Sequence, residues 1–477
     1  MSNLTTSSAG RRIAALLDEN SFVEIGAKVQ ARNTDFNLET KKAPGDGVIT
    51  GYGVIDDSLV YVYSQDASTL AGSIGEMHAR KIVNLYKLAM KTGAPVIGLI
   101  DSAGLRLEEA TDALYALGRI YKNQVEASGV IPQITAVFGN CGGGLALIPG
   151  ITDFTFMESD KAKLFVNSPN AVKDNYEEKC DTASAAFQSE ECGTVDFVAS
   201  EDEVLANIRR LISFLPSNNE EDAIIECTDD LNRGSSVLAS CTKDTAAAFS
   251  EIADNNDFLE VKSAYGKAMV TGFIRLDGQT VGCIANRTQI TGSDGKAAEE
   301  FEPVLTVSGL KKAAKFVKFC DAFNIPVLTM TNTKGYCKCQ CAEKNIAAAA
   351  SAFVYALAES SVPKVNVYVG DALGTAAIVM NSKAISADYT YAWPNAKIGA
   401  MDAKNAAAIM YDGEDKAVVD EKAREYETLQ LSAQSAAQRG YVDTMIDPAD
   451  TRKYVIGAFE MLFSKRELRP DKKHGTI

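Results

Sequence analysis

Short apolar runs alternate with longer amphipathic segments along most of the chain. Residues 94–101 (APVIGLID) and 131–139 (IPQITAVFG) are nearly all apolar, which is typical of strands buried in a parallel sheet. Residues 74–93 and 203–215 place apolar side chains at helical spacing. This alternation predicts an α/β protein with largely parallel strands and right-handed crossovers.

The same pattern occurs twice, once in each half of the chain. Four pairs of segments match in the same order: 50–62 with 271–283, 80–104 with 311–335, 139–143 with 370–374, and 193–215 with 440–462. Such a series indicates an internal duplication. We therefore predict two α/β domains, residues 1–225 and 233–477. Between them, a polar and acidic stretch from residue 215 to about Asn232 has the composition of a linker.

The composition is that of an acidic, soluble globular protein. The net charge of −15 argues against nucleic acid as a partner, because neutralising phosphates requires clustered Lys and Arg. No apolar run approaches the ~20 residues of a membrane span, and the N-terminal segment lacks the apolar core of a signal peptide. The ten cysteines have no framework spacing. We therefore predict reduced thiols and a cytoplasmic location.

A glycine-rich turn, FGNCGGGLALIPG, lies between an apolar strand and an apolar helix-like run. Backbone N–H groups of Gly142–Gly144 at the start of a helix could hold a phosphate or a transient oxyanion. The residues that follow supply no Lys, Ser or Thr partner for a phosphate, so the oxyanion is favoured. The alternative is that the glycines only allow close packing. The duplicated turn at 370–376 suits a reaction in which two partners become negative at oxygen.

The remaining chemistry-bearing residues each have a plain structural alternative. A Ser-His-Asp triad could use only His78, because the other histidine, His474, lies in the terminal tail; a histidine in a helix is more often packed. No HExxH sequence or well-spaced ligand set indicates a metal. Cys337, Cys339 and Cys341 (CKCQC) are open to three interpretations: a metal site, reactive thiols or a tolerant loop.

An acidic and basic cluster follows the predicted strand at 94–101. Within DSAGLRLEEA, Asp101, Arg106, Glu108 and Glu109 fall at the end of a strand where α/β folds bind ligands. Surface ion pairing and helix capping are the alternative.

At these residues the sequence resembles a known family. It is similar to the carboxyltransferase component of biotin-dependent acyl-CoA carboxylases and decarboxylases, particularly the propionyl-CoA carboxylase β subunit and the methylmalonyl-CoA decarboxylase α subunit. The resemblance covers nearly the whole chain and rests on RIAALLDENSFVEI (12–25), GDGVITGYG (45–53), SQDASTLAGSIGEMHARKI (64–82), GAPVIGLIDSAGLRLEEA (93–110), FLPSNN (214–219), KFVKFCDAFNIPV (315–327), MNSKAISADYTYAWPNAKIGAM (380–401) and KKHGTI (472–477).

The resemblance implies a fold, an activity and partners. The fold would be two tandem crotonase-like domains of ββα-superhelix type, with acyl-CoA on the 1–225 side and biotin on the 233–477 side. The assembly would be a homo-hexamer with active sites at dimer interfaces. A carboxyl group would move between biotin, attached to a separate carrier protein, and the α-carbon of a coenzyme A thioester. Biotin carboxylase, or membrane decarboxylase subunits, would be further chains.

The resemblance also implies roles for individual residues. The first oxyanion hole falls on Gly143 and Gly144, and the second on Thr375 and Ala376, where the family usually has Gly-Ala. Ile378 matches a position linked to acyl-chain selection. Residues implied to bind substrate are Gly72, Ser73, Ala103, Gly104, Arg106, Gly142, Gly374 and Ile378. Arg80 and Lys81 are candidates for the CoA phosphates by position, and no metal is expected.

One region departs from the family. Residues 334–353 (KGYCKCQCAEKNIAAAASAF) lack the prolines, later glycines and histidine that the family carries on the biotin side. Acyl-CoA binding is therefore better supported than the second half-reaction. Alternatives are a decarboxylase α subunit of a sodium pump, a crotonase-type acyl-CoA enzyme, and a non-catalytic acyl-CoA-binding scaffold. The sequence does not specify the acyl group (propionyl or methylmalonyl, acetyl or malonyl, or glutaconyl) or the direction of reaction.

Overall fold

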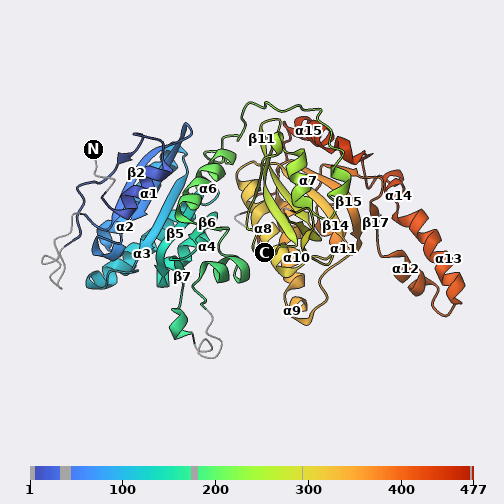
Figure 1. Ribbon diagram of the computed structural model, residues 1–477, viewed down its shortest axis with the longest axis horizontal. Helices are drawn as coiled ribbons and strands as arrows, with labels where there is room; N and C mark the ends of the chain where they lie inside the picture. The colour runs from blue at the N-terminus through green and yellow to red at the C-terminus, as the bar shows by residue number, and fades with distance from the viewer. Residues whose placement is uncertain (1–5, 33–44, 173–180, 293, 473–474, 477) are drawn as a thin grey trace. The chain divides into compact units, whose positions relative to one another are not determined.

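The chain divides into two compact units, Met1–Glu221 and Asp222–Ile477, whose elements are labelled in Figure 1. The computed structural model describes residues 6–32, 45–172, 181–292, 294–472 and 475–476. Within these ranges no helix is both long and apolar enough to cross a membrane.

The first unit is built on an eight-stranded sheet with strand order β1-β2-β3-β4-β5-β6-β8, and β7 pairs with β5. The first three strands are antiparallel and the others run parallel. The strands are β1 (Val23–Glu24), β2 (Val48–Ile55), β3 (Ser58–Gln65), β4 (Val96–Ser102), β5 (Gln133–Gly142), β6 (Phe154–Glu158), β7 (Lys163–Phe165) and β8 (Phe197–Ala199). The main helices are α1 (Ser8–Leu16), α2 (Glu76–Thr92), α3 (Ala110–Ala127), α4 (Ile148–Ile151) and α6 (Glu201–Phe214).

The helix boundaries follow from local sequence signals. Ser200 and Glu203 form a capping box that starts α6. Gly93 ends α2 in the left-handed conformation, and its N–H donates to Ala89. The apolar face of α2, including Ile82 and Leu85, is buried in the same core as β4. This packing explains why β4 is apolar on both faces.

The second unit repeats the strand order of the first. Its eight-stranded sheet has the order β18-β16-β15-β14-β11-β10-β9, with β17 on β15, and a separate hairpin joins β12 to β13. The strands are β9 (Phe258–Glu260), β10 (Met269–Leu276), β11 (Gln279–Asn286), β12 (Gln289–Thr291), β13 (Ala297–Glu300), β14 (Val327–Thr333), β15 (Lys364–Leu373), β16 (Tyr389–Ala392), β17 (Lys397–Gly399) and β18 (Thr444–Met445). The helices are α7 (Thr245–Ile252), α8 (Val307–Ala322), α9 (Gln340–Glu343), α10 (Ile346–Glu359), α11 (Gly374–Val379), α12 (Ala403–Met410), α13 (Lys416–Tyr426), α14 (Ala433–Gln438) and α15 (Thr451–Leu462).

The repetition extends to single contacts. The Thr50 hydroxyl donates to the carbonyl of Ile25, and its repeat-mate Thr271 donates to Val261. A parallel bridge joins Ile74 to Leu105 in the first unit, and an equivalent bridge joins Leu305 to Tyr336 in the second. The predicted fold, two tandem α/β domains of one topology, is confirmed.

A pair of glycines shows both the repetition and its limits. A Cβ at Gly139 would overlap the carboxylate of Asp101, and a Cβ at Gly370 would overlap the amide of Asn332. Asp101 pairs with Arg12 of α1 at 3.2 Å. Asn332 instead donates through its side-chain amide to the carbonyl of Thr242 at 2.9 Å. The close approach is the same in both units, but the charge is not.

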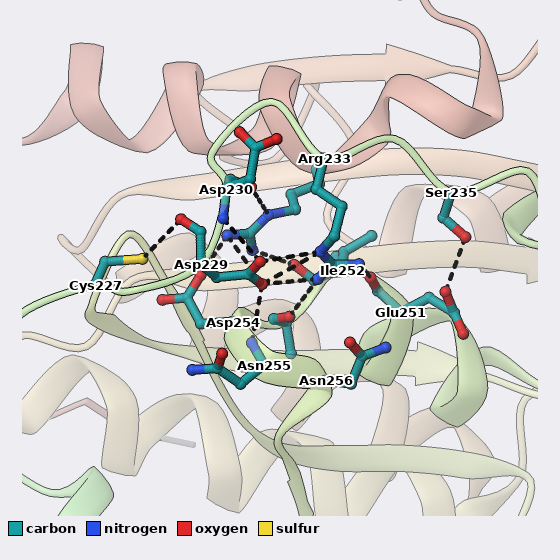
Figure 2. A network of polar contacts seen from close by, with 12 residues as sticks. Cys227, Asp229, Asp230, Arg233, Ser235, Glu251, Ile252, Asp254, Asn255 and Asn256 are labelled. Carbon is teal, nitrogen blue, oxygen red and sulfur yellow. Dashed lines mark hydrogen bonds and ion pairs between the residues drawn. The ribbon is translucent and has the colours of Figure 1, made fainter.

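The end of the acidic stretch, residues 229–233, packs against the second unit through a network of hydrogen bonds (Figure 2). Arg233 binds Asp229 and also donates to the carbonyl oxygens of Glu251 and Ala253. The backbone N–H of Asn255 donates to the same Asp229 carboxylate at 2.9 Å. Residues 229–233 therefore belong to the body of the second unit.

Arg452 of α15 is buried beside this cluster, 3.6 Å from the Asp229 carboxylate. Its guanidinium donates to Asp254 at 2.7 Å and to the carbonyl oxygens of Ile252 and Asp230. Arg452 thus connects helix α15, near the end of the second unit, to residues near the beginning of that unit.

Candidate active site

The first glycine turn begins where β5 ends. Gly142 is still extended, and Gly143 turns the chain with φ of 61° into the 3₁₀ turn Gly143–Leu147. The first N–H groups of such a turn have no acceptor within it. The hydroxyl of Tyr121, from α3, donates to the carbonyl of Gly144 and so stabilises the turn.

The second glycine turn begins in the same way where β15 ends. Gly374 has φ of 64° and is the first residue of α11. A Cβ at Gly143 would meet nothing within 4 Å, and one at Gly374 would lie 3.4 Å from the carbonyl of Ala400. Backbone conformation, rather than space, is what requires glycine at both positions.

The repeat places Gly144 on Thr375, so the structural equivalents of Gly143 and Gly144 are Gly374 and Thr375. Ala376, the second residue of the hole expected from the family, follows one residue later in the first turn of α11. The N–H groups of all three residues belong to that first turn.

The predicted substrate-binding residues of the first unit gather beside the first turn. Ala103 donates its N–H to Ala71, and the hydroxyl of Ser102 donates to the carbonyl of Gly72 at 2.7 Å. Gly104 lies next to the first turn, since a Cβ on it would be 4.0 Å from the carbonyl oxygen of Gly142. The loop that follows β4 therefore lines one side of this glycine turn.

Arg106 does not face solvent. Its guanidinium is buried and bound to Asp46 and to Glu109, with 2.9 Å to the Glu109 carboxylate. It also donates to the hydroxyl of Ser73 at 3.2 Å and to the Ser73 carbonyl at 2.6 Å. Burial raises the pKa of Asp46, while Arg106 opposes that shift. Arg106 thus positions the loop that carries Gly72 and Ser73.

The two candidates for CoA phosphates have different surroundings. Arg80 is exposed and pairs with Glu76 at 2.9 Å. It lines a cavity of about 410 Å³ together with three further cations, Arg32, Lys87 and Arg119, and two carboxylates, Glu76 and Asp112. Lys81 is buried, its ammonium donates to the carbonyl of Val48, and burial lowers its pKa. Of the two, Arg80 is the residue that an anion can reach.

A mainly apolar cavity of about 660 Å³ opens beside the second turn. Gly374, Thr375 and Ile378 are among its lining residues, whereas Ala376 is buried. Its lining also includes Tyr368, Ala372, Ala377, Ile398, Ser382, Lys383 and Arg439. Such a cavity suits a small ligand with a few polar atoms.

A second, more polar cavity of about 710 Å³ is lined by Asn332, Lys334 and Asp371, among others. The ammonium of Lys334 lies 3.5 Å from the carboxylate of Asp371. Leu373, directly before the glycine turn, also lines it. The second turn is therefore flanked by two cavities of different polarity.

His78 is a packed residue. Its Nδ1–H donates to the carbonyl of Asp46 at 2.9 Å, and Nε2 accepts from the amide of Gln65 at 3.2 Å. Complete burial lowers the pKa of His78 to about 3. A neutral imidazole with both nitrogens engaged is a structural element, as the alternative from the sequence proposed.

Asp46, Ser102 and Tyr121 support the site but were not singled out by the sequence. For Ser102 the sequence held a signal, because the repeat aligns it with another hydroxyl residue, Thr333. The Thr333 hydroxyl donates to the carbonyl of Pro303 as that of Ser102 does to Gly72. Asp46 and Tyr121 had none, since each reaches its partner from a distant part of the chain.

The comparisons with known proteins agree with this geometry. A model of the carboxyl transferase domain matches residues 6–477. The chain belongs to the carboxyl transferase family. It is 39% identical to the methylmalonyl-CoA decarboxylase subunit alpha of Veillonella parvula, covering 98% of this chain and 92% of the relative. It is 38% identical to the propionyl-CoA carboxylase beta chain of Roseobacter denitrificans, covering 98% and 93%.

Among solved structures, the carboxyl transferase core of transcarboxylase 12S superimposes with a TM-score of 0.92 at 34% identity, covering 99% of this chain and 93% of that one. That protein was described as a hexamer with hydrolysed methylmalonyl-coenzyme A bound. The prediction of an enzyme of the biotin-dependent acyl-CoA carboxyltransferase type is confirmed. The roles of the individual site residues stay predictions.

Proposed function

We propose that this carboxyl transferase moves a carboxyl group between biotin, carried on a separate protein, and the α-carbon of a short acyl-CoA. The observation that carries the proposal is the pair of glycine turns, which begin with the same backbone conformation at the end of equivalent strands. A reaction with two anionic partners needs two such turns.

The first turn would act on the thioester. N–H groups of Gly143 and Gly144 donate to the thioester oxygen as it becomes an enolate, and the loop of Gly72, Ser73, Ala103 and Gly104 shapes the adjoining wall. Removing one such donor typically costs about 3–4 kcal/mol of transition-state stabilisation. The rate therefore depends on how well the Gly143 N–H is aligned with the thioester oxygen.

The second turn would act on biotin. Biotin supplies a ureido nitrogen that accepts and releases the carboxyl group. The N–H groups of Thr375 and Ala376, with Gly374 beside them, would hold its ureido oxygen. The apolar cavity next to Thr375, about 660 Å³, is large enough for a small ring system.

The acyl group we propose is of the propionyl or methylmalonyl type. Two relatives carry these acyl groups in their names, and the similar transcarboxylase bound hydrolysed methylmalonyl-CoA. Ile378 would contribute an apolar wall, which alone discriminates a methylene by about 1–3 kcal/mol. Acetyl, malonyl and glutaconyl thioesters are therefore the competing substrates to assay. We place the CoA phosphates at Arg80 and its neighbouring cations.

The assembly we propose is a homo-hexamer with each site completed at a dimer interface. The hexamer described for transcarboxylase 12S supports it. A biotin carrier protein would dock on the second unit, and either a biotin carboxylase or membrane decarboxylase subunits would complete the system.

The experiment is decarboxylation of methylmalonyl-CoA and malonyl-CoA in the presence and absence of free biotin. Wild type is compared with Gly143→Pro, which removes the N–H and cannot adopt the left-handed backbone. Gly118→Ala is the matched control, because a Cβ there meets nothing within 4 Å in helix α3. We expect biotin-dependent turnover in wild type and control, and its loss in Gly143→Pro with the hexamer retained.

A non-catalytic acyl-CoA-binding subunit is the second candidate, favoured by the altered segment 334–353. This segment contains the loop 334–339, helix α9 and the first half of helix α10, and it adjoins the polar cavity through Lys334. Wild-type protein that binds methylmalonyl-CoA without biotin-dependent turnover would support this candidate and contradict the transferase.

A further inference from the structure

Three cysteines gather between β14 and α10. Cys337 lies in the loop, Cys339 is the N-cap of α9, and Cys341 lies within that helix. The Sγ atoms of Cys339 and Cys341 are 2.7 Å apart, and the thiol of Cys337 donates to Cys339 at 3.6 Å. Cys339 and Cys341 are both exposed. The sulfurs of these two exposed residues are therefore within reach of one another, which is the first requirement for a disulfide.

The other described cysteines have different surroundings. Cys141, Cys241, Cys283 and Cys320 are buried, and burial raises the pKa of each thiol. Cys192 is exposed and Cys227 is half-buried, and desolvation raises the pKa of both thiols as well. The pKa of Cys339, in contrast, is lowered, first by the hydrogen bond from Cys341 and next by the backbone N–H of Ala342. Thiolate character and exposure together set the reactivity of a cysteine.

Metal binding has no geometric support here. Among the residues that the structure describes, no group of three or more His, Cys, Asp or Glu side chains is arranged to hold a metal ion. The thiols are therefore considered for their own chemistry.

We propose that Cys339 and Cys341 form a reversible dithiol/disulfide pair that exchanges with small-molecule disulfides. The proposal rests on the direct Sγ contact and on the exposure of both residues.

The exchange takes place in two balanced steps. The Cys339 thiolate attacks one sulfur of a disulfide such as glutathione disulfide, forming a mixed disulfide and releasing one glutathione thiolate. Cys341 then loses its proton to solvent and attacks Cys339 Sγ, releasing the second glutathione thiolate. Two protein thiols are oxidised, one disulfide is reduced, and the released thiolates take up two protons.

The pair lies next to an anchored part of the loop. The N–H of Cys337 donates to the carbonyl of Leu305 at 2.9 Å, and the N–H of Leu305 donates to Gly335 at 2.8 Å. The pair therefore directly follows a loop that is held in place by backbone hydrogen bonds.

The sequence offers a clean assay. Lys338 separates Cys337 from the pair, so trypsin yields residues 335–338 (GYCK) and 339–344 (CQCAEK) as separate peptides. The full-length folded protein is equilibrated with graded mixtures of glutathione and glutathione disulfide, quenched, alkylated and digested. We expect the doubly alkylated peptide 339–344 to be replaced, as glutathione disulfide increases, by an unalkylated peptide. That peptide should be two hydrogens lighter than the free dithiol peptide, and excess glutathione should restore the doubly alkylated form.

Two variants sharpen the assay. Cys341→Ser should accumulate one glutathione on Cys339, because the second step has lost its nucleophile. Cys337→Ser is the matched control and should leave the conversion of peptide 339–344 unchanged. Double alkylation at every glutathione ratio would overturn the proposal, and so would a cross-link between 335–338 and 339–344 as the main product.

Discussion

Gly143 and Gly374 hold the same left-handed backbone conformation, with φ of 61° and 64°, at equivalent points of two sheets. Residues with a Cβ adopt that conformation at a cost of about 1–2 kcal/mol. The chain thus retains, in both units, a position that other residues fill only with strain. This relationship makes the two turns separable targets for substitution.

Gly374→Ala should lower carboxyl transfer without weakening acyl-CoA binding. The added Cβ strains the turn, and displacement of one aligned N–H typically lowers kcat by about 10²–10³-fold. Biotin-dependent decarboxylation and the Kd for methylmalonyl-CoA are the measurements. Gly457→Ala in helix α15, where a Cβ meets nothing within 4 Å, is the control and should retain full activity. A weakened Kd with unchanged kcat would move this turn to the thioester side.

Arg106→Met should destabilise the first unit strongly. The substitution leaves Asp46 and Glu109 buried without their cation, and breaking a buried pair in this way costs about 3–5 kcal/mol. Urea unfolding of the purified protein measures the change. Arg80→Met, which removes an exposed ion pair, is the matched control and should change unfolding little. Equal effects of the two substitutions would argue against a positioning role for Arg106.

Acid should destabilise the protein partly through His78. Its pKa is lowered by burial to about 3, below the ~6.5 of an unfolded histidine, so between these values only the unfolded chain binds the proton. The contribution of His78 is therefore fully present above pH ~6.5 and falls by up to about 1.4 kcal/mol per pH unit below it.

Unfolding titrations of wild type and His78→Asn between pH 5 and pH 7.5 (values chosen to straddle ~6.5) test this. Asparagine keeps a donor for the Asp46 carbonyl but has no titrating group. The variant should be less stable at neutral pH and less sensitive to acid. Parallel pH profiles for the two proteins would show that other groups control acid stability.

Arg452→Met should destabilise the second unit. Asp254, held at 2.7 Å by the guanidinium, would be left buried without its cation, at a cost of about 3–5 kcal/mol. The neighbouring Lys453, which pairs with Asp450 at the surface, supplies the control: Lys453→Met should leave the urea midpoint nearly unchanged. A small effect at Arg452 would show that its carbonyl contacts are easily replaced by water.

The layout of the fold was predictable because its signals are local. Strand 94–101 and helix 74–93 were expected from periodicity, and they correspond to β4 (Val96–Ser102) and α2 (Glu76–Thr92). The duplication was visible because matching segments recur in the same order, and residues that need a special backbone, such as Gly143 and Gly374, are kept in both halves. Such constraints act on single residues and survive sequence divergence.

The side-chain environments were not predictable, because they depend on distant segments. Arg106 was expected to face the ligand, but Asp46 reaches it from a loop far back in the sequence. The sequence around Lys81 likewise gives no sign of burial, yet its ammonium points inward and donates to the carbonyl of Val48. Position at the end of a strand does not determine whether a cation faces solvent or another chain segment.

Asp101 and Asn332, each packed beneath a matching glycine, record how the two halves came to differ. In the first half a carboxylate pairs with Arg12 from the leading helix, and in the second an amide binds the backbone carbonyl of Thr242. A single exchange of either residue for the other would therefore break its present contact. Asn332→Asp would set a carboxylate against that carbonyl, and Asp101→Asn would leave Arg12 with Glu201 as its one carboxylate partner. At this position each half is adapted to its own partner, so the carboxylate and the amide are not interchangeable.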